Sequence, residues 1–211
     1  MQLTRKIQAR KTIRTVLRLN DVSDRLKQLK AHHPDSYRHS VRTAIKAVEI
    51  GLELGYTQEE LEILAISGQL HDMGKIRVPA YILDKKTEPT PQEREIIETH
   101  PRYSLIELLE IHIPIVKETS VQHHEWQNDS YPRRRKVDRR NPNRDSNSEN
   151  PDRRTDNKII TDFSQIIAVG DHFDALTKNR SYRKGLPLEI VKKIMYQQMT
   201  VNPNYLEIAL N

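Results

Sequence analysis

Residues 57–75 read TQEELEILAISGQLHDMGK, and this stretch sets the expected fold class. Thr57 followed by Glu60 is the pattern of a capping box, in which each side chain bonds the other residue's backbone N–H at the start of a helix. The residues that follow are apolar at helical spacing: Leu61, Ile63, Leu64, Ile66 and Leu70. The stretch therefore predicts a strongly apolar helix that leads into an adjacent histidine and aspartate.

Helix signals continue on both sides of this stretch. Residues 1–30 carry apolar residues mostly three or four positions apart, which indicates one amphipathic helix or two short ones. A helix over 36–54 that ends at Gly55 is expected, and a loop over 79–90. Further helices are expected over 91–99 (capped by Thr90), 103–111, 114–124, 163–176 and 187–199. No strand alternation and no internal repeat stand out, so the predicted fold class is all-α.

Length and composition limit the class of protein and the kinds of site. The 211 residues fit one domain with a buried core. No run approaches the roughly 18 apolar residues of a membrane-spanning helix, and no signal-peptide core follows the basic start, so a cytoplasmic protein with no membrane partner is expected. The chain has no cysteine, which excludes disulfides and zinc-thiolate sites. Any metal site must therefore use His, Asp and Glu.

Positive charge is concentrated in two segments. Residues 1–30 hold nine Lys and Arg against two Asp, and residues 133–158 hold ten against five acidic residues. Because the whole chain carries +6, these segments, at +7 and +5, leave the remainder at −6. An acidic body argues against a folded nucleic-acid platform, so no nucleic-acid partner is expected. Residues 131–157 hold one aliphatic residue after their opening Tyr-Pro and are expected to be mobile, because they bury too little to offset their ordering entropy.

A set of histidine and aspartate residues lies on or at the ends of the expected helices. It consists of His39, the pair His71-Asp72, His100, the pair His123-His124, and Asp171; the histidines His32, His33, His112 and His172 are interpreted as structural or surface residues. Imidazole and carboxylate groups bind divalent metals without sulfur. Adjacent helical residues point about 100° apart, so an adjacent pair can reach two neighbouring metals. Two such metals suit phosphodiester hydrolysis, and Lys75, four residues after His71 and expected on the same helical face, could meet a phosphate.

The order of these residues and the sequence around them resembles the HD-GYP subgroup of the HD-domain phosphohydrolases. The resemblance rests on HSVRTAIKAVEIGLELGYTQEELEILAISGQLHDMGKIRVPAYIL from residue 39, TPQEREIIETHP from 90, VQHHEW from 121 and IIAVGDHFDALTKNRSYRK from 166. It covers roughly residues 20–200 and implies an HD-type helical bundle with a metal centre in its core. It also divides the chain into a basic N-terminal helical segment, 1–30, and an HD-GYP-like domain, 31–211, with a disordered basic insertion at 133–158.

The resemblance implies two divalent metal ions that share Asp72 as a bridging ligand. The implied ligands are His39, His71, Asp72 and Asp171 for the first, and His100, His123 and His124 for the second. Some members of the family bind a third metal through an acidic residue one helical turn before the first histidine. Asp35 occupies that position, and a helix cap is the alternative role. Lys75, Arg180 and Arg183 match positions that face substrate phosphates, and His71, Asp72 and Lys75 are the residues assigned to catalysis.

The implied activity is hydrolysis of cyclic di-GMP or a related cyclic dinucleotide to the linear dinucleotide or mononucleotide. Water would be activated at the metals, and the metals, Lys75 and an arginine would hold the phosphate charge. Iron and manganese are the expected metals, although the donor set also accepts zinc or nickel. Two alternatives stay open: an HD phosphohydrolase acting on another nucleotide phosphoester, and a cyclic dinucleotide binding or signalling module with little turnover. The basic N-terminal helix is a candidate site for a protein partner or a homodimer.

The loop after the histidine pair departs from the family pattern HHExxDGxGYP. Residues 123–132 read HHEWQNDSYP, which is one residue shorter and contains no glycine; Ser130 replaces the glycine of GYP. Glycine permits positive φ, so this loop must take another conformation. The change removes no metal ligand and bears on substrate entry and dinucleotide preference. The basic insertion that follows is either an electrostatic funnel for an anionic substrate or a tolerated surface insertion.

Overall fold

The structure is a computed structural model that describes residues 2–126, 131, 161–179 and 183–211. In these parts the chain forms helices and no strand, which confirms the all-α prediction. The helices are α1 (Gln2–Val16), α2 (Asn20–His32), α3 (Pro34–Glu53), α4 (Gln58–Leu70), the 3-10 helix η1 (Met73–Arg77), α5 (Ala80–Leu83), α6 (Pro91–Ile97), α7 (His100–Glu107), α8 (Pro114–Gln122), α9 (Asp162–Thr177), α10 (Leu188–Gln198) and α11 (Pro203–Leu210).

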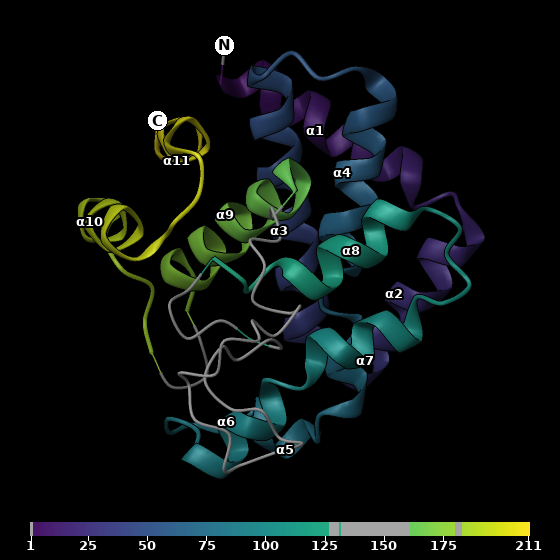
Figure 1. The fold of residues 1–211 in the computed structure, drawn as a ribbon, viewed down its shortest axis with the longest axis vertical. Coiled ribbons are helices and arrows are strands. Elements are labelled where there is room, and N and C mark those ends of the chain that lie inside the picture. Colours follow the sequence, from purple (N-terminus) through teal and green to yellow (C-terminus); the bar gives the residue numbers. More distant parts are fainter. Residues whose placement is uncertain (1, 127–130, 132–160, 180–182) are drawn as a thin grey trace, which may run out of the picture.

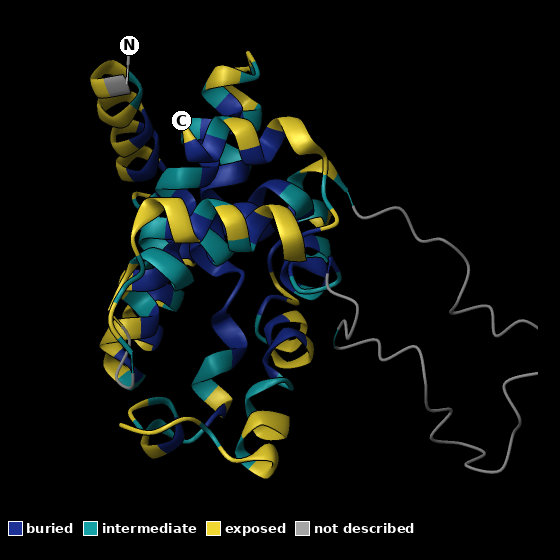
Figure 2. Cartoon of the chain, turned by 90° about the vertical axis from the view of Figure 1, so that its left-hand side faces the viewer, coloured by how far each residue is buried: buried dark blue, intermediate teal, exposed yellow. Residues whose placement is uncertain are grey.

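Helix α3 lies at the centre of the bundle. It packs against α1, α2, α4 and α9, and α8 packs against both α4 and α9 (Figure 1). Its residues Ala44, Ala47 and Val48 are fully buried in the same apolar cluster as Leu64 of α4 and Ile167 of α9. Figure 2 shows this arrangement as dark blue inner faces and yellow outer faces on the helices. Residues far apart in the sequence are therefore brought against one central helix.

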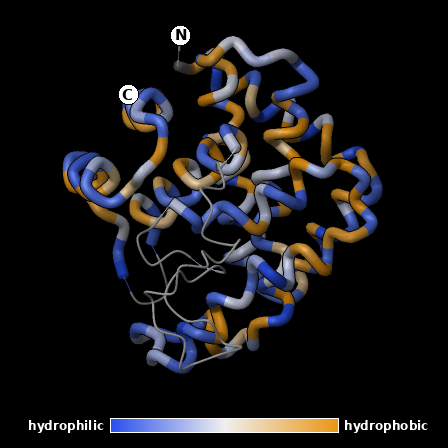
Figure 3. Tube along the Cα trace, viewed as in Figure 1, coloured by the Kyte–Doolittle hydropathy of each residue, from blue (hydrophilic) through white to orange (hydrophobic). Residues whose placement is uncertain are grey.

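The N-terminal segment forms two helices, in agreement with one of the two arrangements expected from its pattern. Helix α1 packs against α3 and α4, and α2 packs against α3 and η1. Ala9 and Ile13 of α1 and Leu26 and Leu29 of α2 are buried in the common apolar cluster. In Figure 3 hydrophobic and hydrophilic stretches alternate along the helices. The described helices include none with the length and hydropathy of a membrane-spanning segment.

The region after α4 differs from the expectation. Helix α4 ends at Leu70 and the chain continues into η1, so Lys75 does not share a continuous helical face with His71, and that prediction is wrong. The change occurs where Gly74 lies too close to the backbone of α7 for any side chain, since a Cβ there would be 2.0 Å from the His100 carbonyl oxygen. Two short helices were also missed: α5 lies inside the predicted loop at 79–90, and α11 follows Asn202.

The capping box at the start of α4 is present as predicted, and it leads to a stability prediction. Thr57 Oγ1 accepts a hydrogen bond from Glu60 N at 3.3 Å, and Glu60 Oε2 accepts one from Thr57 N at 2.8 Å. We expect Thr57→Ala to lower the free energy of unfolding by about 1 kcal/mol, because it leaves a helix N–H without its acceptor. Urea denaturation of metal-free protein measures this. The matched control is Thr15→Ala at the exposed end of α1, and equal stabilities for the two variants would contradict the prediction.

Candidate metal centre

Five parts of the chain carry the seven predicted ligands to one place. His39 lies on α3 and Asp171 on α9, two helices that pack directly against each other. The pair His71-Asp72 follows the last residue of α4, and the pair His123-His124 follows the last residue of α8. His100 is the first residue of α7, which packs against η1 and α8. Both adjacent pairs thus begin at the C-cap of a helix.

The first group is formed by His39, His71 and Asp72. One ligand atom from each lies within 4.8 Å of the others, and all three side chains are buried. Asp171 belongs beside them, since its Oδ1 lies 2.8 Å from His39 Nε2 and 3.9 Å from His71 Nε2. The Nδ1 atom of His71 is hydrogen-bonded to the Gly68 carbonyl at 2.8 Å, which directs Nε2 into the group. In His39 and His71, Nδ1 is hydrogen-bonded outside the group, so Nε2 is the nitrogen available to bind a metal.

The second group is formed by His100, His123 and His124, whose ligand atoms also lie within 4.8 Å of one another. His100 Nδ1 is hydrogen-bonded to the Ile97 carbonyl at 2.7 Å, so Nε2 points into the group. That atom lies 3.2 Å from His123 Nε2. The ring of His124 packs against those of His100 and His123, at centroid distances of 5.2 and 4.1 Å. Three imidazoles without sulfur make a donor set suited to a borderline divalent metal.

Asp72 lies between the two groups and faces each with a different oxygen. Its Oδ2 lies 3.4 Å from His71 Nε2 and 3.6 Å from His39 Nε2. Its Oδ1 lies 3.1 Å from His100 Nε2 and 3.9 Å from His123 Nε2. Asp72 is 1% exposed, and none of the described residues donates a hydrogen bond to its Oδ1. A buried carboxylate oxygen surrounded by imidazole nitrogens fits a bound cation, because burying it alone is unfavourable.

Burial and neighbouring charges shift the pKa values of four groups in the centre. Burial opposes charge on Asp72, but Lys75 and His71 outweigh it and hold the pKa of Asp72 well below its ordinary value. Burial, with the neighbouring histidines, lowers the pKa of His123, and burial lowers that of His124 to about 3. Burial would also lower the pKa of His71, but the Asp72 carboxylate raises it overall. Metal binding requires neutral imidazole, the form that the lowered pKa values of His123 and His124 favour.

The residues predicted to contact substrate phosphates differ in where they lie relative to the metal centre. Lys75 Nζ lies 2.5 Å from Asp72 Oδ2, so its ammonium is beside the centre. Arg183 donates hydrogen bonds to the carbonyls of Ala175 at 2.8 Å and Lys184 at 2.9 Å, near the end of α9. Arg180 lies outside the described residues.

Asp35, predicted either to bind a third metal or to cap α3, belongs to neither ligand group. It is exposed and accepts a hydrogen bond from Arg38. The cap of α3 is His33, whose Nδ1 accepts a hydrogen bond from Ser36 N, so the capping alternative for Asp35 is wrong. The third-metal role stays a prediction.

Three residues that support the centre were missed from the sequence. Asp174 accepts a hydrogen bond from the outer nitrogen of His39, and Arg42 donates to Asp174; each lies one helical turn after a predicted ligand. That spacing was the signal that could have revealed them. Ser104 accepts a hydrogen bond from Gly74 N at 2.8 Å and donates one to the His71 carbonyl at 2.9 Å. Ser104 thus joins α7 to the backbone of the segment from His71 to Gly74.

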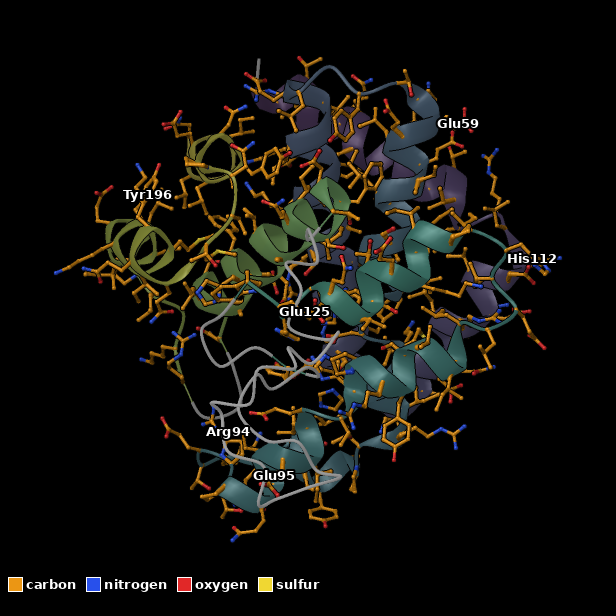
Figure 4. All side chains as sticks on the ribbon, in the orientation of Figure 1. Glu59, Arg94, Glu95, His112, Glu125 and Tyr196 are labelled. Carbon is orange, nitrogen blue, oxygen red and sulfur yellow. The ribbon has the colours of Figure 1, made fainter. Side chains whose placement is uncertain are left out.

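Tyr131 covers one side of the second group. Its ring stacks on that of His124, with centroids 4.4 Å apart and planes 26° apart. Burial, with the carboxylates of Asp171 and Asp72, raises the pKa of Tyr131 well above its ordinary value, so the phenol is protonated at neutral pH. The tyrosine of the altered loop is therefore at the centre, although the residues beside it are outside the described part. His112 is exposed at the edge of the molecule between α7 and α8, as interpreted from the sequence (Figure 4).

Comparison with known proteins places this centre in a family. A family model described as HD domain matches residues 36–176, which include all seven predicted ligands. A cyclic di-GMP phosphodiesterase of Thermotoga maritima is 30% identical over 159 residues, which cover 74% of this chain and 38% of that protein. A cyclic di-GMP phosphodiesterase response regulator, RpfG, of Xanthomonas campestris pv. campestris is 29% identical, covering 69% of this chain and 34% of that protein. A 3'3'-cGAMP-specific phosphodiesterase 2 of Vibrio cholerae is 27% identical, covering 74% and 27%.

The chain spans about a third of the length of these curated relatives. Among solved structures, it is similar to the HD domain of the L. monocytogenes phosphodiesterase PgpH, with a TM-score of 0.58 and 18% identity over 88% of this chain and 93% of that one. The same domain in complex with cyclic-di-AMP gives a TM-score of 0.58 and 19% identity over 89% and 92%. At that identity the likeness supports the fold.

Proposed function

Because the chain belongs to the HD-domain family, we propose that it is a metal-dependent phosphodiesterase that hydrolyses cyclic di-GMP or a related cyclic dinucleotide. The products would be the linear dinucleotide or the mononucleotide. The observation that carries the proposal is the position of Asp72, whose two oxygens face two separate groups of buried histidines. The names of the relatives in three bacteria, cyclic di-GMP and cGAMP phosphodiesterases, support the substrate class.

The proposed cofactors are two divalent metal ions, iron or manganese. His39, His71, Asp72 and Asp171 would hold one, and His100, His123 and His124 with Asp72 the other. Metals held this way activate water and neutralise the charge that develops on a phosphodiester during hydrolysis. The chain's own residues keep the ligands neutral or anionic as required and exclude bulk water, since six of the seven ligands are buried. Asp35 is proposed as a ligand of a third metal.

Lys75 is proposed to bind a phosphate of the substrate. Its ammonium lies beside Asp72 and is largely enclosed, with 14% of the side chain exposed. Such a cation can stabilise an anionic oxygen next to the metal centre. Arg180 and Arg183 are proposed as further phosphate contacts. For Arg183, binding a phosphate requires exchanging the carbonyl partners that it has at the end of α9.

The N-terminal helix is proposed as the site for a protein partner or a second copy. Its residues Leu3 and Ile7 are 73% and 61% exposed, beside the exposed basic residues Lys6, Arg10 and Lys11. The cytoplasmic location and the division at residue 30 stay predictions.

A chromatographic assay tests the proposed activity. Protein with a counted metal content is reloaded with iron or manganese without oxygen and incubated with cyclic di-GMP, mixed cyclic GMP-AMP and cyclic di-AMP. We expect linear dinucleotide from at least one of them, and removal of the metals with a chelator to abolish its formation. The His71→Ala/Asp72→Ala protein serves as the inactive control.

Three outcomes would contradict the proposal. Metal-loaded protein that cleaves none of the cyclic dinucleotides but hydrolyses another nucleotide phosphoester would make it an HD phosphohydrolase of different substrate class. Metal-loaded protein that binds a cyclic dinucleotide without cleaving it would make it a binding module. Cleavage that survives complete metal removal would contradict the metal requirement.

A further inference from the structure

Asp174 is a buried carboxylate of α9 that belongs to neither ligand group. It is 3% exposed and lies three residues after Asp171, on the same side of the helix. His39 Nδ1 donates a hydrogen bond to Asp174 Oδ2 at 2.7 Å. Asp174 therefore contacts the metal centre only through the back of one histidine ring.

Arg42 fixes the direction of this carboxylate. Its Nε donates to Asp174 Oδ1 at 2.6 Å and its Nη2 donates to Oδ2 at 2.9 Å, which is a two-point contact. Such a paired contact restricts rotation of the carboxylate as well as binding it. Both oxygens of Asp174 therefore accept hydrogen bonds, Oδ1 from Arg42 and Oδ2 from Arg42 and His39.

A carboxylate that is paired with Arg42 and accepts from Nδ1 decides which nitrogen of His39 can bind a metal. A neutral imidazole carries one N–H, and a carboxylate can only accept a hydrogen bond. With the proton held on Nδ1, the lone pair is on Nε2, the atom that lies 2.8 Å from Asp171 and 3.6 Å from Asp72. Partners of this kind fix the ring orientation of metal-binding histidines and raise their basicity.

We infer that Asp174, oriented by Arg42, is a positioning residue that selects the Nε2-binding form of His39 and thereby sets the metal affinity of the first group. The inference rests on the metal-binding part of the proposed function and does not depend on the substrate. Arg42 and Asp174 each lie one turn from a ligand on rigid, mutually packed helices, so the three side chains are held together by α3 and α9.

Asp174→Asn tests this with little change in volume. An amide has one oxygen and one NH2 group, so it cannot accept from both Arg42 and His39 without turning its NH2 toward one of them. If the NH2 faces His39, it favours the proton on Nε2, which cannot then bind metal. We expect the dissociation constant of zinc or manganese at the first group to rise by about 10- to 100-fold, and that at the second group to change by less than about threefold.

The readouts do not require catalysis. Chelator competition gives two dissociation constants, and Asp171→Ala protein, which lacks a ligand of the first group, identifies which constant belongs to that group. Histidine 15N NMR of zinc-loaded protein reports whether Nδ1 of His39 carries the proton. The matched control is Asp162→Asn at the exposed start of the same helix, for which both constants should equal those of the unaltered protein.

Equal first-group affinities for Asp174→Asn and the unaltered protein would overturn the inference, and so would equal losses at both groups. If Asp174→Asn fails to fold, Arg42→Gln decides: it leaves the His39 contact possible but frees the carboxylate to rotate, so a smaller loss confined to the first group is expected. Unchanged metal affinity in Arg42→Gln would then reject the role. A failure of cyclic dinucleotide hydrolysis in the unaltered protein would leave these metal measurements unaffected.

Discussion

Asp72→Ala is expected to remove both metal ions from the protein and to lower phosphodiesterase activity by at least about a hundredfold. Changing a residue that only supports a ligand typically reduces metal affinity or activity by about 10- to 100-fold, so losing a shared ligand should exceed that range. Asp72 faces His39 and His71 with one oxygen and His100 and His123 with the other.

Metal counting and the assay of the same samples measure this effect. Asp171→Ala is the matched comparison, because the distances place Asp171 beside the first group and we expect it to lose one metal and keep the other. Far-ultraviolet circular dichroism confirms that each variant retains its helices. Full metal content in Asp72→Ala, or the loss of one metal only, would reject the shared role.

Gly74→Ala is expected to weaken the second group although residue 74 is not a ligand. A Cβ there would lie 2.0 Å from the His100 carbonyl oxygen and 2.5 Å from Ser104 N. Both are backbone atoms, so no side-chain rotation relieves the overlap and α7 must move. Since α7 begins with His100, we expect the second metal to bind at least about 10-fold more weakly and the free energy of unfolding to fall by about 1–3 kcal/mol or more.

Gly55→Ala is the control that separates a displacement of α7 from a general loss of stability. Gly55 lies two residues after the last residue of α3 with φ +76°, and a Cβ there would meet nothing within 4 Å. Gly55→Ala should therefore lower stability by about 1–2 kcal/mol through backbone strain alone and leave both metal affinities unchanged. Chelator competition and urea denaturation are applied to both variants. If Gly74→Ala loses stability but keeps its second metal, α7 does not transmit the overlap to His100.

The order of helices and the ligand set could be predicted because their signals are local. The capping boxes at Thr57 and Thr90 mark α4 and α6, and a proline marks the start of α8. The seven ligands followed from residue type and from the resemblance of short motifs. The structure then brought all seven together, as that resemblance implies.

The missed features depend on contacts between elements. The chain leaves the helical path after Leu70 because Gly74 packs against the backbone of α7, thirty residues away, and no local pattern reports such a contact. The role of Asp174 on α9 depends on its contact with His39 of α3, a helix far away in the sequence. The role of His33 as a cap was missed because the usual cap residues are Ser, Thr, Asp and Asn.

The ligands come from separate elements between residues 39 and 171, in a chain that has no cysteine. A metal ion bound by them would hold these separate elements together in the folded chain, and its binding free energy would add to the free energy of unfolding. Binding to the folded form alone at a hundred times the dissociation constant adds about 2.7 kcal/mol to stability. The supply of metal would therefore govern the survival of this protein against proteolysis, and starvation for the metal would lower the amount of folded protein.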